Sequence, residues 1–132
     1  MLDASGEIRL LLVDDDADVA EMYELQLSAH GYQVSIARTG AEAIDMARSA
    51  APHLIYLDLG LPGMHGFEVL AHLRSEPDTR DIPVVILTNF SEPELIERSR
   101  ALGARDYLVK AHTPPAALAA ATRNRLLAPK AS

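Results

Sequence analysis

The sequence predicts an α/β fold in which a doubly wound, five-stranded parallel sheet is covered by five helices. Short apolar runs alternate strictly with segments whose apolar residues have helical spacing. The runs are too short and too branched for helices, and glycine or proline ends most segments. Such alternation implies parallel strands joined by right-handed helical crossovers, which bury both faces of the sheet.

The first strand–helix unit begins at residue 8 and ends at His30 and Gly31. Residues 8–13, IRLLLV, have the pattern of a buried strand. In the helix that follows, apolar residues recur at i, i+3, i+4 and i+8, which places them on one face. They are Val19, Met22, Tyr23 and Leu27.

A second helix is framed by two more strands. Residues 33–37 alternate as a half-buried strand does, and residues 53–59, HLIYLDL, are a third buried strand. Thr39 is a plausible N-cap for the intervening helix, and Pro52 ends it. The apolar face of this helix carries Ala43, Met46, Ala47 and Ala50.

The rest of the chain continues the same alternation after a turn-rich segment at 60–66. Pro93 suits the first position of a helix, and Gly103 suits the position after its last turn. The expected elements are a helix near 67–74, a strand at 82–88, a helix at 93–102, a strand at 105–110, and a helix that Pro114 and Pro115 open and that runs to about 127.

Length and composition indicate one globular domain over 1–132, with a core at about 8–127. Hydrophobic residues make up 48% and charged residues 23% of the chain, which is not the composition of a disordered protein. The formal net charge of −7 argues against nucleic-acid binding by this domain alone. Because cysteine is absent, thiol catalysis and thiolate metal sites are excluded. No apolar run is long enough for a membrane span and the N-terminus is no secretory signal, so we expect a cytoplasmic protein.

Polar residues stand at the carboxyl ends of four of the predicted strands. Asp14 and Asp15 follow the first strand, and Asp58 lies at the end of the third. Thr88 ends the fourth strand and Lys110 ends the fifth. The carboxyl ends of parallel strands meet at one edge of the sheet, where α/β proteins bind ligands. We therefore expect three carboxylates, a hydroxyl and an ammonium group to converge there.

This set of groups suits a hard cation together with a phosphoryl group. Crowded carboxylates repel one another and raise a pKa unless a cation neutralises them, and oxygen ligands suit Mg²⁺. A carboxylate can also attack phosphorus to form an aspartyl-phosphate. Phosphoryl transfer then depends mainly on charge stabilisation, which a metal and Lys110 can supply, while Thr88 can donate to a phosphoryl oxygen.

Four stretches carry a family pattern, in order and at characteristic spacing: LLLVDDD, LIYLDLGLPGMHGFEVL, VVILTN and ARDYLVK. Through them the chain resembles the receiver domain of two-component response regulators over about residues 8–127. The resemblance implies a flavodoxin-like topology with strand order 2-1-3-4-5. It also implies a phosphorelay signalling switch rather than an enzyme, because such domains only transfer a phosphoryl group to themselves and later lose it.

The resemblance assigns a role to each residue of the predicted site. Asp58 is the implied phospho-acceptor, and its donor is a histidine kinase or a histidine phosphotransfer protein. Asp15 is implied to bind Mg²⁺ directly and Asp14 largely through water. Asp58 and the backbone carbonyl of Gly60 complete the implied protein ligands. Lys110 is implied to pair with the acceptor carboxylate and then with the phosphoryl group.

Two residues are implied to convert phosphorylation into a signal. Thr88 would move to bond the phosphoryl group, and Tyr107 would rotate inward behind it. In the family this changes the surface of the fourth helix, fifth strand and fifth helix, which meets a partner, an output domain or a second copy in a homodimer. A modification that biases two states of such a surface is a switch.

Other interpretations are open. Asp16 stands where a helix N-cap belongs. The same fold is compatible with a docking module that acts without phosphorylation. A phosphatase of the haloacid-dehalogenase type would need a D-x-D-x-[TV] motif after the first strand, but Asp18 or Ala20 occupies its last position.

The sequence departs from the family pattern at three positions. Ala111 replaces the usual proline after Lys110, and a non-proline cis peptide costs roughly 2.5–4 kcal/mol. We therefore expect either a trans peptide with a reshaped loop or a strained cis peptide. Asn89 is bulkier than the usual residue after Thr88 and should narrow access to the acceptor, whereas Gly60 is smaller than usual and should widen it.

Overall fold

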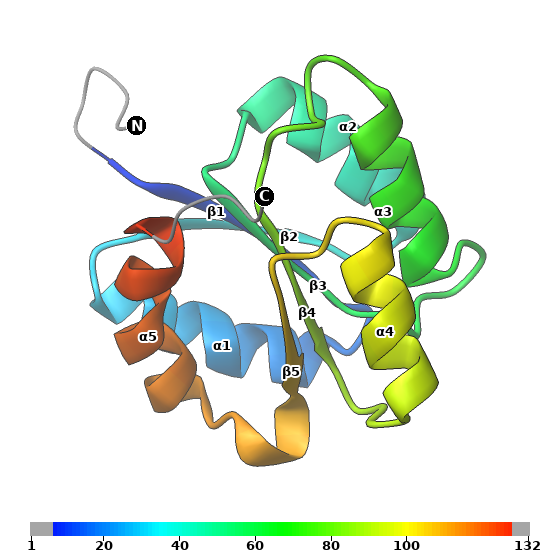
Figure 1. Cartoon of the computed structure of the whole chain (residues 1–132). Coiled ribbons are helices and arrows are strands. Elements are labelled where there is room, and N and C mark those ends of the chain that lie inside the picture. Colours follow the sequence, from blue (N-terminus) through cyan, green and yellow to red (C-terminus); the bar gives the residue numbers. More distant parts are fainter. Residues whose placement is uncertain (1–6, 128–132) are drawn as a thin grey trace.

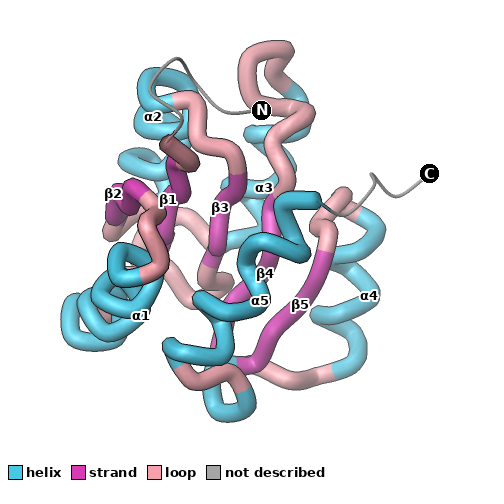
Figure 2. The backbone as a smooth tube through the Cα atoms, turned by 90° about the vertical axis from the view of Figure 1, so that its left-hand side faces the viewer, coloured by secondary structure: helices cyan, strands magenta, loops and turns pink. Residues whose placement is uncertain are grey.

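The sheet of the computed structural model contains five parallel strands in the order β2-β1-β3-β4-β5, which confirms the predicted fold class and strand order (Figure 2). The structure describes residues 7–127, and no helix in that range is both long and apolar enough to cross a membrane. The strands are β1 (Arg9–Val13), β2 (Gln33–Ala37), β3 (Leu54–Leu57), β4 (Val84–Thr88) and β5 (Asp106–Val109). The helices are α1 (Ala17–Ala29), α2 (Gly40–Ala50), α3 (Gly66–Ser75), α4 (Pro93–Ala101), the 3₁₀ turn η1 (Lys110–His112) and α5 (Pro115–Leu127).

Helices cover both faces of the sheet (Figure 1). Helices α1 and α5 lie on one face, and α2, α3 and α4 lie on the other. Successive residues of β1 point to opposite faces, so Leu11 and Val13 join the core under α2 and α3, while Leu10 and Leu12 join the core under α1 and α5. Because each of these four side chains is 1% exposed, the centre of the sheet is buried on both sides.

Side chains that the sequence marks as caps fix the starts of α1 and α2. Asp16 accepts hydrogen bonds from the backbone N–H groups of Asp18 and Val19. Thr39 accepts one from the N–H of Glu42. Both caps satisfy donors that the first turn of a helix leaves unpaired. Asp16 is therefore a helix cap, as predicted.

The prediction that Met22 belongs to the buried face of α1 is wrong. Met22 is 56% exposed, whereas Ala20, Tyr23 and Leu27 are buried. Each residue turns a helix by about 100°, so positions i, i+3 and i+7 from Ala20 form a narrow stripe, and Met22 lies well outside it. Ala20 belongs to the buried stripe, but alanine is small and only weakly hydrophobic, so the sequence pattern did not mark it as a core position.

The observed strands β1, β3, β4 and β5 are shorter than their predicted segments. Strand β3 pairs with β1 up to Leu57, which lies opposite Val13. Asp58 lies beyond the strand, although its N–H still donates to the carbonyl of Val13 at 3.0 Å. The strand order reverses between β1 and β3, so their carboxyl ends border the crevice where such sheets bind ligands.

Candidate functional site

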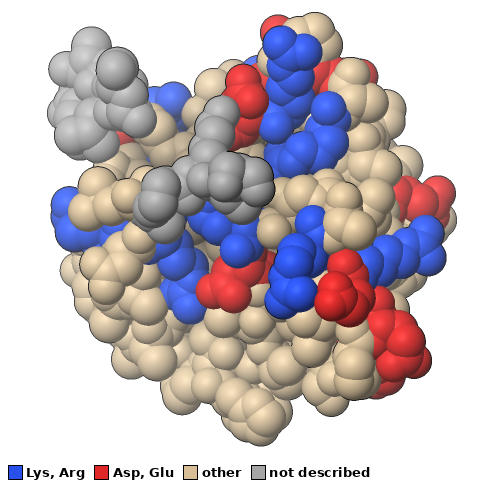
Figure 3. Space-filling model, viewed as in Figure 1, with Lys and Arg blue, Asp and Glu red and all other residues tan. Residues whose placement is uncertain are grey.

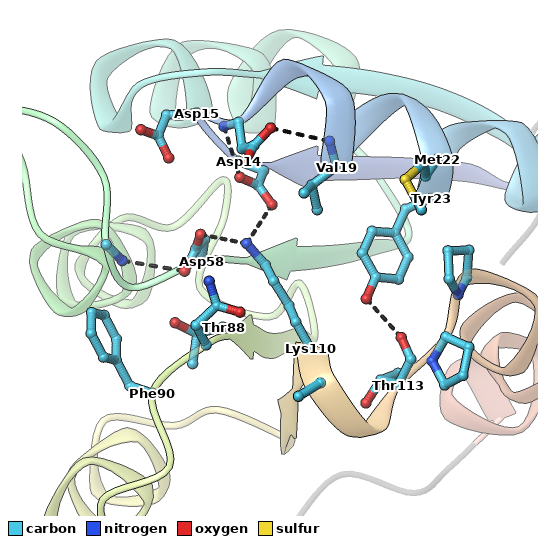
Figure 4. A pocket seen from close by; sticks show the side chains of 16 residues that line it. Asp14, Asp15, Val19, Met22, Tyr23, Asp58, Thr88, Phe90, Lys110 and Thr113 are labelled. Atoms are coloured by element: carbon cyan, nitrogen blue, oxygen red, sulfur yellow. Dashed lines mark hydrogen bonds and ion pairs between the residues drawn. The ribbon is translucent and has the colours of Figure 1, made fainter.

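Three aspartates lie together at the carboxyl ends of β1 and β3 (Figure 4). Asp14 and Asp58 are 1% and 7% exposed, and Asp15 is exposed. One carboxylate oxygen from each residue lies within 4.8 Å of the other two. The backbone N–H of Asp14 donates to Ala37 and that of Asp58 to Val13, each at 3.0 Å, so the sheet itself fixes both residues. The structure thus brings the predicted carboxylates together.

The ammonium group of Lys110 lies between the two buried carboxylates. Lys110 Nζ is 2.7 Å from Asp14 Oδ2, an ion pair, and donates a hydrogen bond to Asp58 Oδ2 at 2.8 Å. The other oxygen of Asp14 accepts from the N–H of Asp16 at 2.9 Å. With Asp15 included, three carboxylates and one ammonium give the cluster a formal charge of −2. A divalent cation would balance this charge.

Burial and pairing act in opposite directions on these groups. Burial raises the pKa of Asp14 above its usual range, and the nearby charge of Asp58 adds to the rise, while Lys110 and the Asp16 N–H oppose it. Burial by itself would lower the pKa of Lys110, but the contacts with Asp14 and Asp58 outweigh it and raise that pKa. Lys110 is therefore a fixed positive charge at neutral pH, and Asp14 carries its negative charge at a cost in stability.

Thr88 contributes a buried hydroxyl to the same edge of the sheet. It ends β4 and is 0% exposed. Its Oγ1 has no hydrogen-bond partner among the residues that the structure describes. A buried hydroxyl without a partner costs free energy, so an incoming oxygen at this place would gain a hydrogen bond that the protein alone does not make.

Tyr107 lies on β5, next to the segment that follows Thr88. Its side chain is half-buried, and its hydroxyl donates to the backbone carbonyl of Phe90 at 2.8 Å. Burial raises the pKa of Tyr107, with smaller contributions from the charges of Glu92 and Asp58, so the hydroxyl is a donor at neutral pH. The contact joins β5 to the loop between β4 and α4.

Phe90 alters the expected effect of Gly60 on access. A Cβ atom on Gly60 would lie 3.3 Å from the ring of Phe90, so the aromatic ring takes up the space that the missing side chain leaves. The N–H of Gly60 donates to Asp58 Oδ1 at 3.3 Å, and its carbonyl remains a predicted metal ligand. No sequence pattern marks Phe90 as part of the site, because its position over Gly60 depends on how the loop after β4 folds back.

The predicted residues line a pocket of about 540 Å³. Asp14, Asp15, Asp58, Thr88 and Lys110 form its polar floor (Figure 4). Its walls include largely apolar residues from α1, from η1 and from the segment that opens α5, none of which the sequence assigns to the site. They are Val19, Met22, Tyr23, Ala111, Pro114 and Pro115.

The peptide bond between Lys110 and Ala111 is trans, since no cis peptide occurs within residues 7–127. The chain turns instead through η1, directly after β5. The first of the two conformations expected after Lys110 is therefore the one adopted: a trans bond with a reshaped loop.

A second pocket, at the opposite edge of the sheet, is lined by Arg74, Arg80, Arg100 and Arg105. Arg74 donates to the carbonyls of Arg80, Ile82 and Gly103. Arg74 and Arg100 lie in the last turns of α3 and α4, where positive charge balances the helix dipole. Arg74 and Arg100 therefore stabilise the carboxyl ends of α3 and α4. Figure 3 shows acidic and basic side chains interspersed over the neighbouring α4 face.

A parallel sheet with three carboxylates, a threonine and a lysine at its carboxyl edge defines an α/β domain suited to phosphoryl chemistry. The chain belongs to the response regulator receiver domain family, whose sequence profile matches residues 10–122. This confirms the resemblance drawn from the sequence motifs, and it places the chain in two-component signalling.

Individual relatives agree with this assignment. The chain is 42% identical over 105 residues to the response regulator MprA of Mycobacterium bovis, which covers 78% of this chain and 44% of MprA. It is 40% identical over 106 residues to the phosphate regulon transcriptional regulatory protein PhoB of Escherichia coli, covering 80% of this chain and 46% of PhoB. The chain therefore spans less than half the length of these relatives.

A solved structure also matches the fold. The chemotaxis protein CheY4 of Vibrio cholerae superimposes with a TM-score of 0.83 at 32% identity, over 91% of this chain and 98% of CheY4. The agreement covers nearly all of both chains, so the flavodoxin-like receiver topology is confirmed.

Proposed function

We propose that Asp58 accepts a phosphoryl group from a histidine kinase or a histidine phosphotransfer protein, in a Mg²⁺-dependent reaction. The observation that carries this proposal is the bridge of Lys110 Nζ between Asp14 and Asp58, at 2.7 and 2.8 Å, beside the exposed Asp15. The arrangement supplies a carboxylate for attack on phosphorus and a fixed positive charge beside it.

The donor set fits Mg²⁺. Asp14, Asp15 and Asp58 offer oxygen ligands within 4.8 Å of one another, and the carbonyl of Gly60 is the further ligand expected in this family. Mg²⁺ prefers one or two carboxylates, retained waters and phosphate oxygens. When bound, the ion supplies positive charge that offsets the crowded carboxylates and the transferring phosphoryl group.

The residues of the chain divide the transfer between them. A carboxylate oxygen of Asp58 forms a bond to phosphorus while the bond from phosphorus to the donor nitrogen breaks, and the electron pair of that bond stays on the nitrogen. Lys110 keeps its charge beside the acceptor throughout, because its pKa is raised. The hydroxyl of Thr88, unpaired among the described residues, donates to a phosphoryl oxygen after transfer.

The response then passes to the surface of α4, β5 and α5. When Thr88 moves toward the phosphoryl group, it pulls on the loop that contains Phe90, whose carbonyl holds the hydroxyl of Tyr107. The hydrogen bond between Tyr107 and Phe90 forms in the conformation of the loop described here. A conformation of the loop without this bond would be the second state of the switch. The changed surface signals to a partner, to an output domain such as a transcriptional regulator carries, or to a second copy in a homodimer.

On this proposal the chain is a cytoplasmic switch with only self-directed phosphoryl transfer, not an enzyme with turnover. Intact-mass measurement after incubation with Mg²⁺ and acetyl phosphate tests it. The wild type should gain one phosphoryl group, and Asp58→Asn should gain none. Asp16→Asn is the matched control, because Asp16 caps α1 and Asn caps helices about as well as Asp.

Two results would contradict the proposal. A wild type that gains no mass, but still binds a partner, would favour a phosphorylation-independent docking module. Repeated hydrolysis of an added phosphomonoester, lost in Asp14→Asn but kept in Asp58→Asn, would favour a phosphatase instead.

A further inference from the structure

The position of the Lys110 ammonium depends on the backbone on both sides of that residue. On one side, β5 is paired with β4, with Val109 opposite Thr88. On the other side the chain enters the turn η1, whose peptide bonds are trans and which contains no proline. A turn of one 3₁₀ winding is short and its hydrogen bonds are poorly aligned, so it needs support from elsewhere.

Hydrogen bonds that support this turn converge on Thr113. Its N–H donates to the carbonyl of Lys110 at 3.1 Å, and its Oγ1 donates to the carbonyl of Val109 at 2.8 Å. The carbonyl of Thr113 accepts a hydrogen bond of 2.7 Å from the hydroxyl of Tyr23. The first two bonds are local, whereas the third joins the turn to α1, 90 residues away in the chain.

The side chain of Tyr23 is buried in the core between α1 and the turn η1. The residue is 4% exposed and Thr113 is 9% exposed, so water does not replace their hydrogen bond easily. Burial raises the pKa of Tyr23, so its hydroxyl keeps the proton that it donates. Figure 4 shows the ring of Tyr23 reaching from α1 toward Thr113, beside the Lys110 side chain.

We propose that Tyr23 is a positioning residue for Lys110: its hydroxyl ties the trans turn after Lys110 to α1, and so holds the ammonium group between Asp14 and Asp58. This inference rests on the proposed role of Asp58 as phosphoryl acceptor. Tyr23 touches neither the acceptor nor the phosphoryl group in this scheme. It acts through the backbone of residues 110–113.

The test removes only the hydroxyl, in Tyr23→Phe, and follows the rate of phosphorylation by acetyl phosphate at saturating Mg²⁺. We expect a rate about tenfold lower, because a displacement of about 1 Å in a catalytic group can cost up to 100-fold. The matched control is Tyr56→Phe, which loses a buried 2.7 Å hydrogen bond between the hydroxyls of Tyr56 in β3 and Thr122 in α5. The control should be destabilised to a similar degree and should keep the wild-type rate.

A second readout separates positioning from general loss of stability. Amide hydrogen exchange should become faster in residues 110–113 of Tyr23→Phe and stay unchanged there in Tyr56→Phe. In a Lys110→Ala background, Tyr23→Phe should have no further effect on the rate, because two changes that act through one group are not additive. If phosphorylation of the Lys110→Ala variant is too slow to measure, the amide exchange in residues 110–113 tests the positioning role instead.

Each outcome bears on one proposal. If the wild type gains no phosphoryl group, the function of Asp58 is wrong. If the wild type is phosphorylated but Tyr23→Phe matches it in rate, or leaves exchange in 110–113 unchanged, Tyr23 does not position Lys110. A rate loss that persists undiminished in the Lys110→Ala background, or that Tyr56→Phe shares, would also overturn the positioning role.

Discussion

All four residues of β3 are buried, whereas none of the four residues of β5 is, and both strands lie within the described part of the chain. The helices beside them differ in the same way: α3 buries five of its residues, while in α4, residues 93–101, only Ser99 is buried. The proposed acceptor follows β3, and Tyr107 lies on β5.

This difference has a physical consequence for a switch. Segments with little buried apolar surface open at low free-energy cost, and segments in the core open only when the whole domain unfolds. The fold therefore supports the acceptor with its best-packed elements and leaves the α4–β5 edge, the surface proposed to respond, with its weakest packing. Four predictions test or refine this comparison, in order of decreasing effect.

The largest effect should come from equal truncations in the two regions. Leu57→Ala in β3 removes a side chain with 0% exposure and should cost about 3–4 kcal/mol in the free energy of unfolding. Leu95→Ala in α4 removes a half-buried side chain and should cost about 1 kcal/mol. Urea unfolding of the two variants measures the difference. Equal losses would show that α4 is as firmly packed as β3.

The second prediction concerns the charge that the buried centre carries. The pKa of Asp14 is raised in the folded state, so the folded protein binds this proton more readily than the unfolded chain. The pKa of an aspartate in the unfolded chain is about 3.9. As the pH rises from there through the higher pKa of the folded state, ionisation of Asp14 lowers the stability of the fold. Asp14→Asn should increase stability at pH 7, and the gain should disappear below about pH 3.9.

Magnesium provides the control for this second prediction. The ion should stabilise the wild type, since a ligand that binds only the folded state adds to its stability, and it should stabilise Asp14→Asn less. Thermal unfolding with and without Mg²⁺ measures both effects. An Asp14→Asn variant that is less stable than the wild type at pH 7 without metal would contradict the argument.

The third prediction concerns the contact at the edge. Tyr107→Phe removes the hydrogen bond to the Phe90 carbonyl and should cost about 0.5 kcal/mol, because the contact is exposed to solvent. Amide exchange should become faster in residues 89–92 and stay unchanged near Asp58. Tyr32→Phe, on the opposite edge of the sheet, is the matched control. Unchanged exchange in 89–92 would show that the loop does not depend on this bond.

The smallest effect should come from a surface ion pair beside the well-packed region. Arg48 donates two hydrogen bonds to Glu76, at 2.8 and 2.7 Å, and these bonds, with the charges of Arg48 and His72, lower the pKa of Glu76. The ionised Glu76 therefore stabilises the fold at pH values above the pKa of Glu in the unfolded chain. This stabilisation is lost as the pH falls through the lower pKa that Glu76 has in the folded protein. Glu76→Gln should reduce stability only slightly at pH 7, and less at pH 3. A large loss in urea unfolding would show that surface charge, not burial, stabilises α3.

The sequence by itself determined the elements and the chemistry at their ends. These features depend on residues that are neighbours in the sequence, so a sequence pattern can reveal them. They are the strict alternation of strand and helix patterns, the caps Asp16 and Thr39, and the polar residues that follow the strands. Parallel topology then brought Asp14, Asp58 and Lys110 to one edge without further information.

Only the tertiary structure decided which side chains touch across elements. The bond from Tyr23 to Thr113, the ring of Phe90 over Gly60 and the exposure of Met22 all depend on how α1 and the loops after β4 and β5 pack against the sheet. Residues that meet across 30 or 90 positions share no local pattern, and the rotation of a helix about its axis is fixed by packing.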